Sequence, residues 1–193
     1  MKVSVVIPNY NGAELLERNL PKVIQVCKNC EIIVVDDASI DGSIKEIKNQ
    51  IAKIKNTYKK SKIRLLQNEK NLGFASTVNR GVDEASGDLV VLLNTDVIPE
   101  KEFLQPSVKH FSNPQVFAVG FLQKCPENGK IIERGRGIGK FQQGFLIHAR
   151  GAVSRKDTSE VVPMRSGTPQ TVEESKKTLW VSGGAGILRK SIW

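Results

Sequence analysis

The sequence predicts an α/β fold in which a mostly parallel central sheet carries helices on both faces. Four short, mostly apolar runs, at residues 3–7, 32–35, 63–66 and 89–93, alternate with segments whose apolar residues recur at helical spacing. Strands that alternate with helices in this way form parallel sheets, and right-handed crossovers place their carboxyl ends along one edge. Each run ends in polar residues, which we expect to meet at that edge: Pro8-Asn9-Tyr10, Asp36-Asp37, Asn68-Glu69 and Asn94-Thr95-Asp96.

The elements of the first half each have a local signal. The run at residues 3–7 is mostly β-branched, which is typical of a strand buried on both faces. We expect Asn11 to cap a first helix that Pro21 bends or interrupts, and Ser39 to cap a second helix with a lysine-rich solvent face. A third helix should follow the turn at residues 68–73 and end at residues 86–87. The five uninterrupted apolar residues 89–93 then predict a fully buried fourth strand.

After Asp96 the alternation is less regular. Residues 99–111 predict a helix with Pro106 near its start or at a bend, and residues 116–122 predict a strand. Residues 135–139 form a glycine-rich loop in this prediction, and the polar segment 149–177 is expected to be a loop over the site or a segment ordered by a partner. Short strands at 179–182 and 187–188 should flank glycines that let backbone approach a ligand closely.

Composition limits the class of protein. The 193 residues suit one domain, and no apolar run approaches the roughly 18 residues of a membrane helix. The apolar part of the N-terminus is too short for a secretory signal, so we expect a cytoplasmic protein. A net charge of +9 favours anionic partners such as a nucleotide, a nucleic acid or an acidic membrane surface. Three cysteines give no disulfide pattern, and Cys27 and Cys30 lack the second pair that a zinc site needs.

Two phosphate-binding motifs are excluded by spacing. A Walker A loop ending at Gly139-Lys140 would have Arg134 in place of its first glycine and Phe141 in place of its hydroxyl residue. The dinucleotide fingerprint needs three glycines in the first strand–helix turn, where Gly12 stands alone. A carboxylate at the end of a buried strand, such as Asp96, either caps the next turn or holds a hard cation that binds a diphosphate. The convergence of four polar strand ends favours the second interpretation.

Several blocks resemble glycosyltransferase family 2, in order and at the family's spacing. They are VSVVIPNYNG at residues 3–12, IVVDDASIDGS at 33–43, NLGFA at 71–75, NRG at 79–81, ASGD at 85–88, LLNTD at 92–96 and VSGGAG at 181–186. The resemblance implies a GT-A fold over residues 1–193, with a nucleotide-binding half at 1–97 and part of the acceptor side at 98–193. It also implies a metal-assisted, inverting hexosyltransferase that uses Mg²⁺ or Mn²⁺ with a nucleotide-sugar donor. We expect a role in the synthesis of cell-surface polysaccharide or glycan.

Carried over by position, the resemblance assigns roles to particular residues. Asp37 would accept a hydrogen bond from the Watson–Crick edge of uracil or thymine, so the donor would be a UDP- or dTDP-sugar, and Asp36 would orient the turn or meet the ribose. Asp96 would be the metal-binding carboxylate, with Asn94 in place of the motif's first acid. The other residues expected at the nucleotide are Pro8, Asn9, Tyr10, Asn11, Asn71, Gly73, Phe74 and Asn79. Those expected at the donor sugar are Asn94, Thr95, Gly183, Gly184 and Ala185.

The family's catalytic base is an acidic residue just after the last block, so we expect it beyond Trp193. Glu173 and Glu174 precede that block and are poor substitutes. The chain should therefore be a C-terminally incomplete, donor-binding portion with little activity alone, acting on a glycan or lipid-linked acceptor with peripheral membrane association at the inner face. The alternatives are a non-catalytic nucleotide-sugar-binding module, a nucleotidylyltransferase and a nucleic-acid binder. The glycine- and arginine-rich first loop of nucleotidylyltransferases is missing after Ile7, which argues against the second. An aromatic content of 6% offers few stacking platforms, so we expect no nucleic-acid partner.

Overall fold

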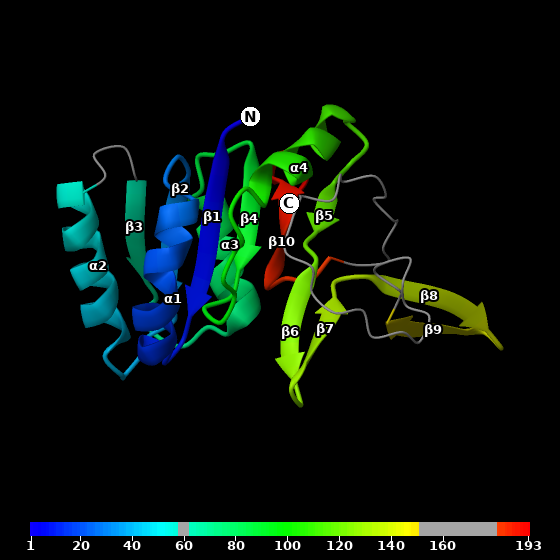
Figure 1. The fold of residues 1–193 in the computed structure, drawn as a ribbon, viewed down its shortest axis with the longest axis horizontal. Helices are drawn as coiled ribbons and strands as arrows, with labels where there is room; N and C mark the ends of the chain where they lie inside the picture. Colours follow the sequence, from blue (N-terminus) through cyan, green and yellow to red (C-terminus); the bar gives the residue numbers. More distant parts are fainter. Residues whose placement is uncertain (58–61, 151–180) are drawn as a thin grey trace. The chain divides into compact units, whose positions relative to one another are not determined.

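The computed structural model describes residues 1–57, 62–150 and 181–193. The chain falls into two compact units, one formed by residues 1–119 and 183–193 and the other by residues 120–182. The first unit holds the central sheet, whose strand order is β3-β2-β1-β4-β10-β5 (Figure 1). The prediction of a single domain with halves at 1–97 and 98–193 stays a prediction.

Strands and helices alternate in the first unit, as the sequence predicts. In chain order they are β1 (Val3–Asn9), α1 (Ala13–Val26), β2 (Glu31–Asp36), α2 (Ser43–Thr57), β3 (Lys62–Gln67), α3 (Phe74–Asp83), β4 (Leu89–Leu93), α4 (Leu104–Lys109), a 3₁₀ turn (His110–Ser112), β5 (Ala118–Gly120), β10 (Ala185–Arg189) and a second 3₁₀ turn (Lys190–Ile192). Strands β3, β2, β1 and β4 are parallel, and β10 runs antiparallel to β4. In the described ranges no helix is long and apolar enough to span a bilayer.

Apolar side chains on both faces of the sheet form the core. Every residue of β4 is buried, as are six of the seven residues of β1. Helix α1 packs with α2, and α3 packs against β1 and β2 (Figure 1). Helix α3 lies very close to the sheet at Gly81, where an added Cβ would come within 2.4 Å of Val6 Cγ1. Glycine is therefore required at this contact.

The second unit contains two antiparallel hairpins. Strands β6 (Gln123–Glu127) and β7 (Lys130–Arg134) form the first, and β8 (Gly137–Gln142) and β9 (Phe145–Arg150) form the second. Both two-residue turns, Asn128-Gly129 and Gln143-Gly144, have positive φ at each position, as type I′ hairpins require. The expected glycine-rich loop at 135–139 is wrong from Gly137 onward, because strand β8 begins there.

Several predicted boundaries differ from the structure. Helix α4 begins at Leu104 rather than near residue 99, and β5 covers 118–120 rather than 116–122. Pro21 lies inside α1 without ending it. Of the strand expected at 179–182, residues 181 and 182 are not in a strand, and residues 179 and 180 lie outside the described residues. Of the loop expected at 149–177, everything after residue 150 also lies outside the described residues. Strand β10 starts at Ala185, so the second half of the glycine-rich segment at residues 183–186 belongs to a strand.

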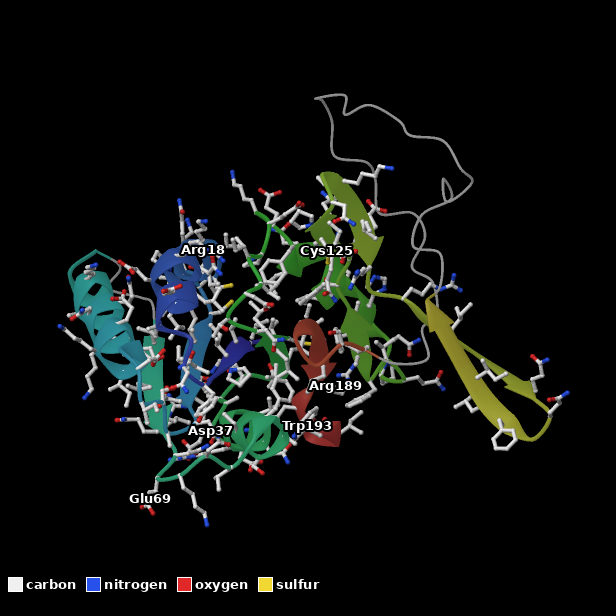
Figure 2. All side chains as sticks on the ribbon, turned by 90° about the horizontal axis from the view of Figure 1, so that it is seen from below. Arg18, Asp37, Glu69, Cys125, Arg189 and Trp193 are labelled. Atoms are coloured by element: carbon white, nitrogen blue, oxygen red, sulfur yellow. The ribbon has the colours of Figure 1, made fainter. Side chains whose placement is uncertain are left out.

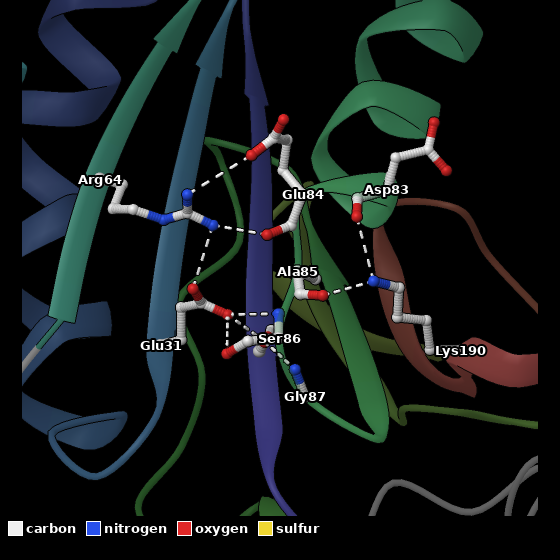
Figure 3. Close-up of polar contacts among 9 residues, drawn as sticks. Glu31, Arg64, Asp83, Glu84, Ala85, Ser86, Gly87 and Lys190 are labelled. Carbon is white, nitrogen blue, oxygen red and sulfur yellow. Dashed lines mark hydrogen bonds and ion pairs between the residues drawn. The ribbon is translucent and has the colours of Figure 1, made fainter.

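The amino ends of the strands are joined by polar contacts around Glu31 (Figure 3). Its Oε2 accepts hydrogen bonds from Ser4 Oγ at 2.6 Å and from the N–H and hydroxyl of Ser86 at 2.8 and 2.9 Å. Its Oε1 is 3.1 Å from Arg64 Nη2. Lys190 Nζ donates to the carbonyl of Asp83, at the end of α3, and to that of Ala85, just before Ser86. These contacts fix the edge opposite the predicted site.

Candidate functional site

The polar residues after the strands lie along the carboxyl edge of the sheet. Asn9 pairs in register with Asp36, and Asp36 pairs with Gln67, so β1, β2 and β3 end at the same level. Pro8 is the buried residue before this edge and pairs with Val35. Tyr10 follows β1 and is 53% exposed. The predicted convergence of the strand ends is present in the structure.

Asn9 and Asp36 join the ends of the two central strands. Both are buried, and Asn9 Nδ2 donates to Asp36 Oδ1 at 2.8 Å. The second oxygen of Asp36 accepts the N–H of Ser39 at 2.9 Å. Asp36 therefore orients the turn after β2, which was one of its two predicted roles. No donor among the described residues reaches Asn9 Oδ1, and an added Cβ at Gly12 would lie 2.5 Å from that oxygen.

The loop between β2 and α2 is fastened to the start of α1. Asn11, with φ of 51°, accepts the N–H of Ile40 through Oδ1, and its own N–H donates to Ser39 Oγ. Asp41 accepts the N–H of Ala13 at 3.0 Å and the N–H of Ser43 at 2.9 Å. One carboxylate therefore caps both helices, and the predicted caps, Asn11 for α1 and Ser39 for α2, are wrong. Burial opposes ionisation of Asp41, but these hydrogen bonds outweigh it and lower its pKa.

The carboxylate of Asp37 holds the turn that follows β3. It is 3% exposed, and its Oδ1 accepts the N–H of Leu72 at 2.9 Å and Asn68 Nδ2 at 2.7 Å. Its Oδ2 accepts the N–H of Gly73 at 2.9 Å, and the Thr77 side chain also donates to this carboxylate. Burial raises the pKa of Asp37, but the hydrogen bonds outweigh burial, so the net shift is downward. The group is an ionised acceptor at neutral pH.

Residues 68–80 complete this turn. Asn71 Oδ1 accepts the N–H of Gly73 at 3.0 Å, and Gly73 has φ of 81°, which favours glycine. Arg80 Nη1 donates to Asn68 Oδ1 at 2.5 Å and so orients the amide that donates to Asp37. Asn79 Oδ1 accepts the indole N–H of Trp193 at 3.2 Å, and Figure 2 shows Trp193 beside α3. Of the residues expected at the nucleotide, Asn71 shapes a turn and Asn79 contacts the last residue.

The segment after β4 is a β-turn. The N–H of Val97 donates to the carbonyl of Asn94 at 3.1 Å, and the N–H of Asn94 donates to the carbonyl of Gly184 at 3.0 Å. Gly184 lies against the Asn94 side chain, since an added Cβ would be 2.4 Å from Nδ2. Asn94 Oδ1 is buried and receives no hydrogen bond within the described part of the chain. Asp96, at the third position of this turn, is exposed.

The glycine-rich segment at residues 183–186, where β10 begins, contacts both the turn after β4 and helix α3. Ala185 pairs with Leu93 and is 2% exposed, and an added Cβ at Gly183 would lie 3.5 Å from the ring of Phe74. Phe74 itself is 53% exposed. The structure therefore brings the residues expected at the donor sugar to the end of β4, where Asp96 is located.

The site offers oxygen ligands rather than a closed metal cage. In the three described ranges no cluster of three or more His, Cys, Asp or Glu side chains could hold a metal ion. Cys27 and Cys30 are buried, and the N–H of Cys30 donates to the carbonyl of Cys27. The hydrogen bond that the Cys27 thiol donates to Cys30, together with burial, raises the pKa of Cys27, whereas accepting this hydrogen bond lowers the pKa of Cys30 despite its burial.

Comparison with known proteins assigns the family. The model of glycosyl transferase family 2 matches residues 4–191. This chain belongs to glycosyltransferase family 2. It is 33% identical over 144 residues to the dolichol-phosphate mannosyltransferase of Pyrococcus furiosus, covering 70% of this chain and 39% of that protein. It is 39% identical over 100 residues to the undecaprenyl-phosphate 4-deoxy-4-formamido-L-arabinose transferase of Proteus mirabilis, covering 50% of this chain and 29% of that protein.

Solved structures agree with the family and confirm the GT-A fold. A mannosyltransferase from Pyrobaculum calidifontis, in complex with GDP-Man and Mn²⁺, matches with a TM-score of 0.56 and 28% identity over 66% of this chain and 37% of that chain. S. aureus TarS in complex with UDP-GlcNAc shares the fold with a TM-score of 0.51 at 24% identity, over 62% of this chain and 34% of that chain. The family 2 member described here thus spans less than two fifths of these relatives' length.

Sequence reasoning gave no role to three residues that shape the site. Asn19 and Arg80 lie on helices, and Asp41 caps two helices. Asn19 alone had a usable signal, because it interrupts the apolar face of α1 formed by Leu16, Leu20 and Val23. A polar side chain on a buried helix face must find a hydrogen-bond partner.

Proposed function

We propose that this glycosyltransferase binds a nucleoside-diphosphate sugar at the carboxyl edge of its sheet and transfers the sugar, with inversion, to an acceptor hydroxyl. The observation that carries the proposal is the turn after β4, where the exposed Asp96 follows a strand that is buried along its whole length. Ligands of open α/β sheets bind at this edge. The family and the ligands named for the solved relatives, GDP-Man and UDP-GlcNAc, support a nucleotide-sugar donor.

The residues of the turn fit a hard divalent cation. Asp96 offers an exposed carboxylate, and Asn94 Oδ1 is a buried amide oxygen whose lone pairs receive no hydrogen bond from the described residues. Carboxylate and amide oxygens are the ligands that Mg²⁺ and Mn²⁺ prefer. Asp96 would hold such an ion together with phosphate oxygens and water. When bound, the ion would supply charge neutralisation to the diphosphate leaving group.

The nucleoside is expected beside β1 and β2, with Pro8 and Tyr10 flanking the base. Asp37 would read the imino N–H of uracil or thymine, although two backbone N–H groups and two side chains already donate to it. A carboxylate has about four lone-pair sites, so base reading by Asp37 requires one of these donors to leave. We therefore propose UDP- and dTDP-sugars as donors. We also propose that the turn at Leu72 and Gly73 shifts when the base binds, so that Asp37 becomes free to accept a hydrogen bond from the base.

The acceptor is proposed to be a hydroxyl of a glycan or of a lipid-linked molecule. The names of the relatives, which act on dolichol phosphate and undecaprenyl phosphate, support the lipid-linked class. Transfer would then serve cell-surface glycan synthesis at the inner face of a membrane.

Titration calorimetry tests the proposal directly. UDP, dTDP, GDP and ADP are titrated into the chain with Mn²⁺ and again with EDTA. We expect UDP or dTDP to bind at least about tenfold more tightly than ADP, a difference of 1.4 kcal/mol, and to bind more tightly with Mn²⁺ than without it. Equal affinities for all four nucleotides would contradict base reading at Asp37. Absence of any nucleotide binding would contradict the proposed site itself.

A further inference from the structure

We infer that Asn19, on helix α1, is a positioning residue that sets the direction of the Asp96 carboxylate. This inference rests on the proposed function, in which Asp96 binds the donor's metal ion. Asn19 is 1% exposed and lies on the buried face of α1. Its Nδ2 donates to the carbonyl of Thr95 at 2.9 Å, across 76 residues of sequence. That carbonyl belongs to the peptide unit whose N–H is that of Asp96.

Three hydrogen bonds among the described residues hold the turn at different points. The hydrogen bond from the N–H of Asn94 to the carbonyl of Gly184 holds the first residue of the turn. The hydrogen bond from the N–H of Val97 to the carbonyl of Asn94 closes the turn. Neither bond involves the central peptide between Thr95 and Asp96. The amide of Asn19 is the group that holds this peptide, and it does so from outside the turn.

The central peptide is the part of a β-turn that can rotate while the closing bond remains. Type I and type II turns differ by a flip of this peptide, and type II requires a positive φ at the third residue. The third residue here is Asp96, and its φ is not in the positive range. The bond from Asn19 therefore favours the type I arrangement. Rotation of this peptide would redirect the side chain of Asp96, because that side chain begins at the adjacent Cα.

The consequence is that Asn19 should govern metal affinity without contacting the metal. Removing a group that orients a metal ligand typically costs about 10–100-fold in metal affinity. Nucleotide binding without metal is proposed to depend on the residues after β1, β2 and β3. Among the described residues, the side-chain hydrogen bonds of Asn19 go to Arg18 and Thr95, outside that set. The two affinities should therefore respond differently to a change at residue 19.

The experiment compares Asn19→Leu and Asn19→Asp with the wild-type chain. Both replacements are similar to asparagine in size and lack its N–H donor, and Asn19→Asp serves if the leucine variant fails to fold. Asn49→Leu, at an exposed position of α2, is the matched control. For each protein we measure the Mn²⁺ concentration that half-saturates the enhancement of UDP or GDP binding, and the affinity for the same nucleotide in EDTA. Urea unfolding checks that each variant is folded.

We expect the half-saturating Mn²⁺ concentration to rise at least tenfold in the Asn19 variants, with affinity in EDTA changed less than about twofold. An unchanged Mn²⁺ requirement would overturn the inference, and so would an equal loss in both measurements, which would indicate a purely structural role. Asp96→Asn separates this result from the proposed function. If Mn²⁺ enhances binding equally in wild type and Asp96→Asn, the metal site is elsewhere and both ideas fail.

Discussion

Glu31 joins the amino ends of three strands, and we predict that Glu31→Gln lowers stability far more than Glu84→Gln. Glu31 Oε2 accepts three hydrogen bonds from Ser4 and Ser86, and its side chain is 11% exposed. Hydrogen bonds to charged groups contribute about 1.5–3 kcal/mol each, and glutamine retains one acceptor oxygen. Two of the three bonds go to an exposed residue, so we expect a net loss of about 2–3 kcal/mol.

Glu84 is the matched control because it pairs with the same arginine. Its carboxylate is 3.5 Å from Arg64 Nη1, and both side chains are exposed, at 51% and 41%. Solvent screens such a pair, so Glu84→Gln should cost less than about 1 kcal/mol. The assay is urea unfolding followed by far-UV circular dichroism. With a slope of about 2 kcal/mol per molar, the midpoint of Glu31→Gln should fall by about 1–1.5 M.

The pH dependence gives an independent check. Burial opposes ionisation of Glu31, but hydrogen bonds from Ser4 and Ser86 and the charge of Arg64 outweigh it and lower its pKa in the folded state. A carboxylate with a lowered pKa stabilises the fold fully above its unfolded pKa of about 4.3. That contribution is lost as pH falls through the folded pKa. The difference between wild type and Glu31→Gln should therefore be full at pH 7 and shrink below about pH 4. Equal midpoints for the two glutamine variants at pH 7 would refute the reasoning.

Three further predictions concern the helix–sheet contact and the site. Gly81→Ala should lower the unfolding free energy by about 1–3 kcal/mol in the same urea assay, because its Cβ would overlap Val6; a neutral effect would mean that α3 can move away from the sheet. Asp37→Asn should weaken UDP binding at least tenfold in calorimetry and also lower the urea midpoint, because its amide NH₂ would face the N–H groups of the turn; unchanged affinity would show that the base is read elsewhere. Asp96→Asn should abolish the Mn²⁺ enhancement of UDP binding. Because Asp96 is exposed, the same change should alter the unfolding free energy by less than about 0.5 kcal/mol.

The sequence determined the sheet and the edge that carries the site. Apolar runs and their polar ends are local properties, so the periodicity sufficed to place β1, β2, β3 and β4 and to predict that their ends meet. The structure agrees with that prediction, since Asn9 pairs in register with Asp36. The same pattern pointed to Asp96, to which the family blocks assign metal binding, and the structure places it exposed in the turn after β4.

Only the tertiary structure decided which side chains hold those ends in place. Asp41 caps two helices, Asn19 reaches Thr95 across 76 residues, and Asp37 accepts N–H groups from a turn 35 residues later. The position of β10 between β4 and β5, antiparallel to β4, was equally beyond the sequence. A hydrogen bond depends on distance and angle between groups that crossovers bring together, and those distances exist only once the helices have packed on the sheet. Local sequence patterns record burial and turn chemistry, and they do not record which distant donor will meet a given acceptor.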